Sequence, residues 1–333
     1  MTQIAHGQVA SIGPLIGWGG NFSGEANPPP GPFRGFGCGY EHAVGIRVDG
    51  ALEAWGNPKA GNLNVPSGTF AAVAPNLKWS LGLRTNGTLV AWGSAVWGQT
   101  SPPSGTYLAI ASGPLNGYAL RPDGTVAAWG ANSDGQMVVP PGAFTAIAAG
   151  NNHVIGLRPD GTLVGWGGNS SGQTNVPPGV FVQVAAGESH SMALTPTGQV
   201  LAWGRNVHGQ CNVPAGTYKA ITAGGFWSLA IRTDGTLAAW GSDFSTQIST
   251  LPAGRYVAIS AGHGFGIAMP EGCWANCDAS TTSPTLTVND FICFLNKFAA
   301  GDTYANCDGS AVPPVLNVND FVCYINVFAA GCS

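Results

Sequence analysis

Short apolar segments, separated by polar and glycine-rich stretches, run through the first 269 residues of the chain. A segment such as "FTAIAAG" or "YKAITAG" is followed by a turn, by a second segment such as "HSMALTP" or "WSLAIRT", and by a third such as "TLVGWG". Runs of this length, rich in β-branched and aromatic residues and bounded by turn residues, are typical of β-strands. No helical spacing of apolar residues stands out over residues 1–269, so we expect this part to be all-β.

The second and third segments of each unit are separated by Asp-Gly, Asn-Gly or Thr-Gly, as in "RPDGTLVGWG". Such a dipeptide between two alternating runs is a strong hairpin signal, and it favours a type I′ turn with positive φ at both central residues. A polar loop such as "GNSSGQTNVPPG" then leads to the next unit. Each unit therefore predicts a three-strand meander that ends in a loop.

The units form an internal repeat with a period of 37 residues. A Trp-Gly pair marks each copy, at Trp18, Trp55, Trp92, Trp129, Trp166, Trp203 and Trp240. Repeats of about 40 residues with several short strands are typical of propeller blades. The chain starts with a half unit, "ASIGPLIGWGGN", and the region ends with the complementary half, "RYVAISAGHGFGIAM". We expect the two halves to share one blade and to close a seven-bladed ring.

The unit "GESHSMALTPTGQVLAWGRNVHGQCNVPAG" resembles the repeat of the RCC1-like propellers in its G-x-x-H, W-G and N-x-x-G-Q elements. The short copies ending in "GQTNVP" most resemble the bacterial form found in the β-lactamase inhibitor protein II type. This resemblance covers residues 1–269 and implies a seven-bladed β-propeller. It says little about function, because one fold hosts many functions.

The style of the sequence changes after Met269-Pro270, where residues 271–333 form a second module. Two copies of a 30-residue unit begin with "ANCDASTTSPTLTVNDFICFLNKFAAG" and "ANCDGSAVPPVLNVNDFVCYINVFAAG". In each copy Asn-Asp opens an apolar segment whose Phe, Leu or Ile residues recur at i, i+4 and i+7. That spacing predicts one face of a helix, and Ala-Ala-Gly ends it.

Oxygen-bearing side chains at alternate positions, followed by an acidic residue at a helix start, follow the logic of a calcium loop, since Ca²⁺ prefers six to eight oxygen ligands. The two loop–helix units resemble a dockerin, in particular the Cys-rich tails of planctomycete secreted proteins. The resemblance implies two Ca²⁺ ions and these ligands: Asn276, Asp278, Ser280, Thr287, Asp290, Asn306, Asp308, Ser310, Asn317 and Asp320. Each loop departs from the pattern by starting with Asn and by carrying three extra residues. A disulfide-held helical pair without metal is the alternative.

Six of the eight cysteines lie in this module, at Cys273, Cys277, Cys293, Cys307, Cys323 and Cys332. An even set in so small a module predicts disulfides and an oxidising compartment, while the spacing argues against zinc. Six cysteines allow 15 pairings, and the sequence does not choose among them. We therefore expect a secreted or surface-attached protein whose signal peptide has been removed, since "MTQIAHGQVA" has no signal character. Cys38 and Cys211 fall in separate blades and are expected to be unpaired core residues.

Several regular features have a structural interpretation. A residue found at one position of every blade, such as the Trp-Gly tryptophan, is expected to pack blade against blade. His42, His153 and His190 occupy the last position of the G-x-x-H turn, where other blades have Trp79, Asn116, Trp227 and Phe265. A position that alternates between His and aromatic residues does not predict a metal site, so we expect hydrogen-bonded structural histidines.

Residues that break the repeat inside turns are better candidates for function, because burial in the core does not require them there. Aromatic residues gathered at one end of a propeller would form a recognition surface. The partner-binding candidates of the G-x-x-H turns and the N-x-x-G-Q loops are Phe22, Tyr40, Glu41, Trp79, Trp97, His208, Phe226, Trp227 and Phe244.

Composition narrows the function. Only 8% of the residues are charged and the net charge is −4, which argues against a nucleic-acid partner. No apolar run is long enough to span a membrane as a helix. No catalytic motif stands out from the repeat, so we expect a monomeric binding protein rather than an enzyme.

The favoured hypothesis is a protein-binding propeller, with a tail that docks to a cohesin-like receptor or a surface. An inhibitor of the β-lactamase-inhibitor type and an accessory component of a polysaccharide-degrading assembly are the alternatives. A nuclear nucleotide-exchange role fits poorly with a disulfide-bearing chain.

Overall fold

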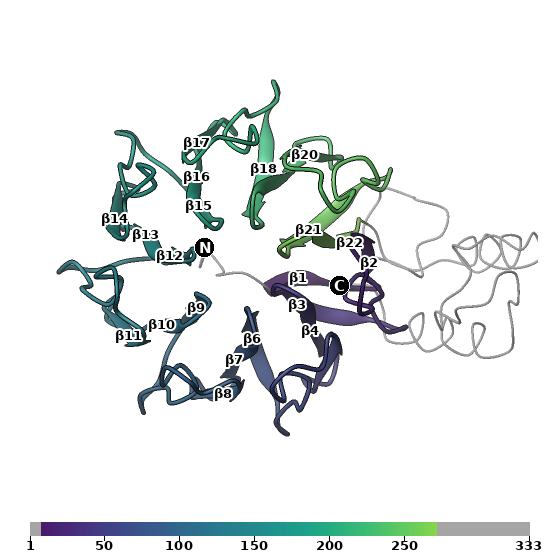
Figure 1. Ribbon diagram of the computed structural model, residues 1–333, viewed down its shortest axis with the longest axis vertical. Helices are drawn as coiled ribbons and strands as arrows, with labels where there is room; N and C mark the ends of the chain where they lie inside the picture. Colours follow the sequence, from purple (N-terminus) through teal and green to yellow (C-terminus); the bar gives the residue numbers. More distant parts are fainter. Residues whose placement is uncertain (1–7, 272–333) are drawn as a thin grey trace, which may run out of the picture.

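The described part of the chain is a ring of seven antiparallel β-sheets around a central axis. A computed structural model describes residues 8–271, and all their regular elements are strands (Figure 1). The all-β propeller expected from the repeat is thereby confirmed for these residues. The predicted calcium module, with its ten candidate ligands and six cysteines, lies outside them.

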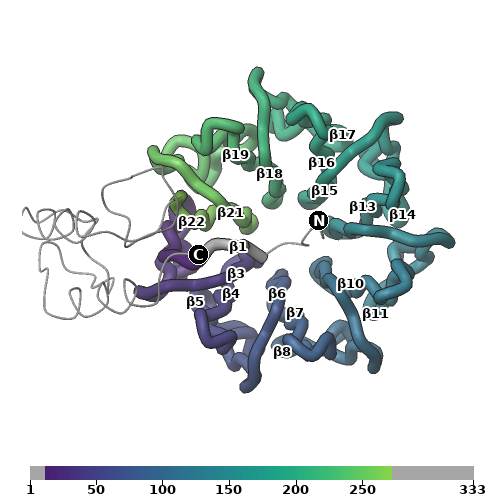
Figure 2. The backbone as a smooth tube through the Cα atoms, turned by 180° about the vertical axis from the view of Figure 1, so that it is seen from behind, coloured from purple at the N-terminus to yellow at the C-terminus, as the bar shows by residue number. Residues whose placement is uncertain are grey.

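Each blade has the same meander, in which the first strand of a unit lies nearest the ring axis (Figures 1 and 2). The inner strands are β3 (Phe33–Cys38), β6 (Phe70–Pro75), β9 (Ala109–Ser112), β12 (Ala146–Ala149), β15 (Gln183–Ala186), β18 (Tyr218–Ala223) and β21 (Tyr256–Ala261). The middle strands are β4 (His42–Arg47), β7 (Trp79–Arg84), β10 (Asn116–Leu120), β13 (His153–Leu157), β16 (His190–Leu194), β19 (Trp227–Arg232) and β22 (Phe265–Pro270). The outer strands are β5 (Leu52–Gly56), β8 (Leu89–Gly93), β11 (Val126–Gly130), β14 (Leu163–Gly167), β17 (Val200–Gly204), β20 (Leu237–Gly241) and β2 (Ile16–Gly19). We number the blades 1 to 7 in the order of their inner strands.

The two ends of the propeller region meet in blade 7. Strand β2, near the start of the chain, is the outer strand of the sheet formed by β21 and β22. It runs antiparallel to β22, with Trp18 opposite Gly266 and Ile16 opposite Ala268. The ring is therefore closed by strands from both ends of the region, as the two half units predict. One further strand, β1 (Gln8–Gly13), adds to the inner edge of β3 and makes blade 1 four-stranded.

The Trp-Gly tryptophans join neighbouring blades, as expected. The indole N–H of each donates a hydrogen bond to a backbone carbonyl in the loop that ends the preceding blade, at 2.8–3.0 Å. At the closure, Trp18 donates to the carbonyl oxygen of Gln247 in the loop of blade 6. The ring of Trp203 is half-buried and the other six are buried. Because these contacts recur at every interface, they hold the seven blades as one body.

The Asp-Gly turns differ from the predicted type I′ geometry. In blade 4, Gly161 has a positive φ of +84°, whereas the φ of Asp160 is not positive. Arg158 and Thr162 instead flank a three-residue turn, in which the Arg158 N–H donates to the Thr162 carbonyl. The Asp160 carboxylate accepts bonds from the Thr162 N–H and hydroxyl, at 2.9 and 2.7 Å. The type I′ prediction was therefore wrong, because the Asp holds the turn through its side chain and only the Gly needs positive φ.

Candidate functional site

Both sets of variable loops lie at one end of the ring, which we call the loop end. The G-x-x-H turns join the inner and middle strands, and the N-x-x-G-Q loops follow the outer strands. Backbone hydrogen bonds tie the two sets together: the Asn57 N–H donates to the Glu41 carbonyl at 2.7 Å, and the Ser94 N–H to the Lys78 carbonyl at 2.9 Å. The Asp-Gly turns lie at the opposite end. The two sets of loops therefore form one surface.

The last position of the G-x-x-H turn has a structural role in the described blades. His42, His153 and His190 are fully buried, and each Nε2 lies 2.8–3.0 Å from a serine Oγ of the next blade. The Ser191 and Ser228 hydroxyls already donate to backbone carbonyls, so the Nε2–H of His153 and of His190 must be the donor to them. The prediction of hydrogen-bonded structural histidines is confirmed.

Burial sets the protonation state of these three side chains. The Nδ1 atom of each has no hydrogen-bond partner, so a proton there would place an unpaired charge in the interior. Desolvation lowers the pKa of His42 and of His153 to about 4, and that of His190 to about 3. All three are therefore neutral at pH 7.

Trp79 and Trp227 occupy the same buried position in blades 2 and 6. Both side chains are fully buried, and their indole N–H groups donate to backbone carbonyls of the next blade, Gly113 and Gly262. A partner cannot reach them in this structure. Their prediction as surface contacts is corrected, because the turn position they share with the histidines points between blades.

Glycines at the first position of these turns let the blades approach closely around the axis. A Cβ on Gly187 would lie 2.5 Å from the carbonyl oxygen of Gly224, and one on Gly224 would lie 2.4 Å from that of Gly262. The same contact recurs around most of the ring. No side chain fits at such distances, so glycine is required wherever the next backbone comes this near. The next residue of each turn is thereby placed at the mouth of the axial channel.

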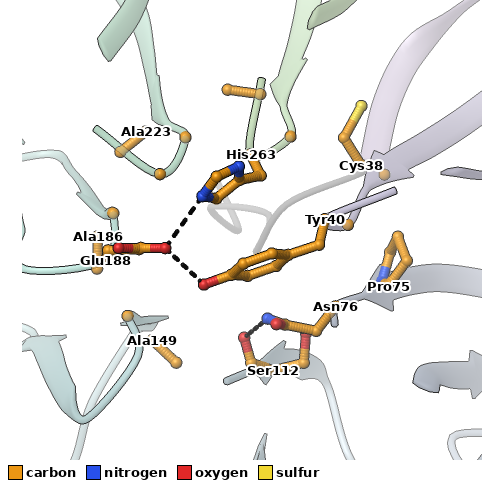
Figure 3. A pocket seen from close by; sticks show the side chains of 18 of the residues that line it. Cys38, Tyr40, Pro75, Asn76, Ser112, Ala149, Ala186, Glu188, Ala223 and His263 are labelled. Atoms are coloured by element: carbon orange, nitrogen blue, oxygen red, sulfur yellow. Dashed lines mark hydrogen bonds and ion pairs between the residues drawn. The ribbon is translucent and has the colours of Figure 1, made fainter. Parts of the chain in front are cut away.

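Four of the residues that follow these glycines meet at the channel mouth, and Figure 3 shows three of them, Tyr40, Glu188 and His263. The Tyr40 hydroxyl donates to Glu188 Oε1 at 2.8 Å and approaches Asn151 Oδ1 at 3.0 Å. His263 Nε2 lies 3.2 Å from the same Glu188 oxygen, and its ring stacks on Tyr40 with centroids 4.6 Å apart. The four side chains come from blades 1, 4, 5 and 7. They form a polar cluster that spans the channel mouth.

The cluster lines a cavity of about 80 Å³. The wall consists mainly of glycine, alanine and small hydroxyl residues of the inner strands, together with Asn76 and Cys38 (Figure 3). Burial raises the pKa of Glu188, but hydrogen bonds from His263 and Tyr40 and the charges of His263 and Arg205 outweigh it, so the net pKa lies below the usual value. Burial and the neighbouring carboxylate raise the pKa of Tyr40. At neutral pH the cavity therefore holds a carboxylate hydrogen-bonded to a protonated phenol.

A row of aromatic rings leads from this cluster to the rim of the loop end. Phe226 lies 5.9 Å from His263, His208 lies 5.4 Å from Phe226, and Phe244 lies 5.5 Å from His208, measured between ring centroids. The Arg205 guanidinium lies 5.4 Å from the centre of the Phe226 ring. The row, from Tyr40 to Phe244, crosses blades 1, 7, 6 and 5. The structure thus brings together four of the predicted candidates, which come from three of the repeats: Tyr40, His208, Phe226 and Phe244.

The remaining candidates lie on the same end but outside the row. Phe22 is 92% exposed on the loop of blade 7, next to the blade that carries Phe244, which is 82% exposed. Trp97 is 57% exposed on the loop of blade 2. Glu41 is exposed and forms an ion pair with Lys59 at 2.8 Å. The exposed aromatic surface is therefore concentrated on blades 6 and 7, with Trp97 apart from it.

Glu188 and His263 were not among the predicted candidates. Glu188 is separated from Tyr40 by a whole number of 37-residue periods, so it occupies the same turn position, whereas one extra residue in the last unit shifts His263 by one. Superposing the units would have placed Tyr40, Asn151 and Glu188 around the axis. Asn151 and Glu188 are polar, so the presence of a large apolar side chain in a turn does not identify them.

Other predicted features can be placed as well. Cys38 and Cys211 are both unpaired, as expected, but each is partly exposed rather than in the core. Within residues 8–271 there is no group of three or more side chains suited to hold a metal ion. The same residues contain no helix that could cross a membrane.

The family profile described as "Regulator of chromosome condensation (RCC1) repeat" matches residues 144–173 and 181–210. These segments are blades 4 and 5 with the loops that follow them. A search of curated proteins found no match. Two of the seven blades thus match the RCC1 repeat, in a ring of sheets that is a seven-bladed β-propeller.

Solved structures share this fold. Prp20p from Saccharomyces cerevisiae is 18% identical with a TM-score of 0.70, and the match covers 79% of this chain and 92% of that one. Human WBSCR16 is 16% identical with a TM-score of 0.67, covering 78% and 100%. The CRINKLY WD40 ectodomain of the Arabidopsis thaliana receptor kinase ACR4 is 21% identical with a TM-score of 0.59, covering 69% and 87%. At these identities the similarity shows the fold alone.

Proposed function

We propose that the propeller is a protein-binding module that uses the loop end as its recognition surface. The supporting observation is the exposure of Phe244, at the outer end of the aromatic row, and of Phe22 on the adjacent blade. Neither side chain is needed by the core, and exposed aromatic residues on a rigid frame are typical of interaction hot spots. Prp20p, which shares the fold, is described by its binding to Gsp1p and histones. Binding of another protein is thus a use to which this fold has been put.

The rigidity of the ring favours binding over shape change. The loops are fixed by side-chain caps, such as the Gln210 amide oxygen that accepts from the His208 N–H at 2.9 Å. A loop that is already ordered loses little conformational entropy on binding. The seven blades therefore offer a pre-formed surface whose specificity lies in the residues that differ between copies.

Partner capture with matched variants tests this proposal. The immobilised protein is compared with a Phe22→Ser/Phe244→Ser variant and with a Leu108→Ser/Val180→Ser control. Leu108 and Val180 are 53% and 55% exposed, and they lie toward the opposite end of the ring. We expect a partner that the wild type and the control retain and that the aromatic variant loses. Equal recovery by all three proteins would contradict the proposal.

We also propose that the protein is secreted and that residues 271–333 bind two Ca²⁺ ions to dock it to a receptor or a surface. The support is the sequence alone: six cysteines and the repeated Asn-x-Asp-x-Ser pattern before Asp290 and Asp320. Calcium titration of the full chain by calorimetry, without reductant, tests the metal sites. Two binding events are expected, one lost in Asp290→Ala and the other in Asp320→Ala. No binding would leave a disulfide-held module without metal.

A further inference from the structure

The charge of the channel-mouth cavity is unbalanced. Among the described residues, Glu188 is the only carboxylate that lines the cavity, and no lysine or arginine lines it. The Glu188 side chain is 15% exposed, so its charge is only partly solvated. The titratable base within the lining is His263, which contacts one carboxylate oxygen. Arg205 acts on Glu188 only through its charge from outside the lining, and no contact between the two side chains is among the ion pairs of the described residues. A half-buried carboxylate that no fixed cation contacts favours the entry of a cation.

One side of the carboxylate is free to accept further hydrogen bonds. Tyr40 and His263 both contact Oε1, whereas Oε2 accepts no hydrogen bond from the described residues. A carboxylate has about four lone-pair sites, and the two contacts use only part of them. Tyr40 therefore holds the Glu188 carboxylate in place, and the carboxylate can still accept a hydrogen bond from a further donor.

The surroundings of the carboxylate also suit a positive charge. The Tyr40 and His263 rings both line the cavity and stack with an interplanar angle of 20°, whereas Phe226 packs edge-on against His263 from outside the lining. Aromatic faces attract cations, most strongly where water is excluded. An anion would be repelled by Glu188, and an apolar ligand would leave the carboxylate buried without a counter-charge. The chemistry selects an ammonium or guanidinium group.

We propose that this cavity binds a lysine or arginine side chain of the partner protein, with Glu188 as the counter-ion. This inference rests on the proposed function and names the residue type that the partner presents. The cavity of about 80 Å³ has room for the end of one side chain rather than for a folded element. The aromatic row begins at this cavity and ends at Phe244, so an inserted basic side chain would bring the rest of the partner over the exposed aromatic residues.

Blocked amino acids serve as probes for the site. Nα-acetyl-lysine amide and Nα-acetyl-arginine amide carry the two cations, and Nα-acetyl-norleucine amide is the uncharged analogue of the lysine probe. Binding is measured by NMR titration of the full chain, and each variant is first checked for an unchanged thermal unfolding midpoint. We expect saturable binding of at least one cationic probe in the millimolar range, and none of the norleucine probe.

Glu188→Gln removes the charge but keeps an oxygen for the Tyr40 hydroxyl. This substitution is expected to weaken binding of the cationic probe at least about tenfold, or 1.4 kcal/mol. Asp134→Asn removes an exposed carboxylate from the loop of blade 3 and is expected to change nothing. Equal binding to wild type and Glu188→Gln, equal binding of the norleucine probe, or no binding of either cation would overturn the proposal. Tighter binding of putrescine than of both probes would assign the cavity to a free amine and would also overturn it.

The two proposals fail separately. The probe titration involves no partner protein, so loss of the cation site would leave the capture experiment with Phe22 and Phe244 unaffected. Conversely, if the Phe22→Ser/Phe244→Ser variant captured the partner as well as the wild type, the proposed function would fail, but the measured affinities of the probes for the cavity would not change.

Discussion

At the scale of single residues, the G-x-x-H turn separates structural and functional roles by one or two positions. Its last residue points between blades and is buried, as in His153 and Trp227. The residue after the glycine points to the channel mouth, as in Tyr40 and Glu188. Residue type alone therefore does not indicate the role of a turn residue. Two tryptophans that were predicted as partner contacts are buried between blades, and Glu188, which was not among the candidates, lines the cavity.

The neutral histidines make stability depend on pH. In the unfolded chain a histidine titrates near pH 6.5, whereas His153 has a pKa of about 4 in the fold. The unfolded state therefore binds more protons below pH 6.5, so the stabilisation present at neutral pH is lost as the pH falls toward 4. The same holds for His42 and His190. Between pH 7 and pH 5, we expect the unfolding free energy of His153→Asn to fall by roughly 2 kcal/mol less than that of the wild type.

Denaturant unfolding at pH 7 and pH 5 measures this difference. Asn is a matched replacement because Asn116 fills the same position in blade 3, where it is also buried. An unchanged pH dependence in His153→Asn would mean that the histidine is not held neutral by burial.

At the scale of strands and turns, the sequence predicted the number and order of elements but not all of their geometry. The Trp-Gly period located every blade, and the half units located the closure, because a strand pattern repeated seven times is hard to mistake. The turn type was missed because Asp-Gly fits both a two-residue turn and a three-residue turn that ends in a glycine bulge. The threonine two residues after Asp160 distinguishes them, since the Asp side chain binds its N–H and hydroxyl.

The close approach of neighbouring inner turns makes a second prediction. In Gly187→Ala the added methyl group would meet the Gly224 carbonyl oxygen at 2.5 Å and the buried His190 ring. Backbone on one side and a fixed ring on the other leave little room to adjust, so a loss of about 1–3 kcal/mol in unfolding free energy is expected.

Gly225→Ala is the matched control, because the atoms nearest to its methyl group would be those of the His263 ring, at 2.7 Å, and not a backbone carbonyl. That side chain lies at the channel mouth and is half-buried, so it can move aside. Thermal and denaturant unfolding of both variants test the comparison. A loss in Gly225→Ala as large as in Gly187→Ala would show that backbone contact around the axis is not the constraint.

At the scale of the whole molecule, stability depends on closure of the ring. The sequence predicted this closure from two half units alone, whereas the convergence of Tyr40, Asn151, Glu188 and His263 required the ring itself. Those four residues come from blades that are far apart in the chain, and only the common axis brings them together. The candidate surface was therefore predicted in part, through its aromatic members, and its polar centre was not.

Removal of residues 1–20 is expected to open the ring. It deletes β2 and the Trp18 side chain, which is 6% exposed and bonded to the loop of blade 6. Loss of a buried tryptophan alone costs about 3–5 kcal/mol, and the unpaired edge of β22 adds to it. Of the described elements, removal of residues 1–13 deletes only β1, which lies outside the closing sheet, and should cost much less. Unfolding followed by tryptophan fluorescence compares the two; equal losses would mean that closure does not dominate.

The pairing of β2 with β22 also sets a time order for the protein during its synthesis. Strand β2 precedes the inner strand of blade 1, and its partner is complete only after about 250 more residues, which at 5–20 residues per second takes roughly 10 to 50 s. Blades 1 to 6 can fold as they emerge, each against its predecessor. During this time Trp18 lacks the residues of blades 6 and 7 that bury it. The nascent chain thus carries an unfinished arc with two open edges until Pro270 has left the ribosome, and the last blade to be completed contains a strand made before the inner strand of blade 1.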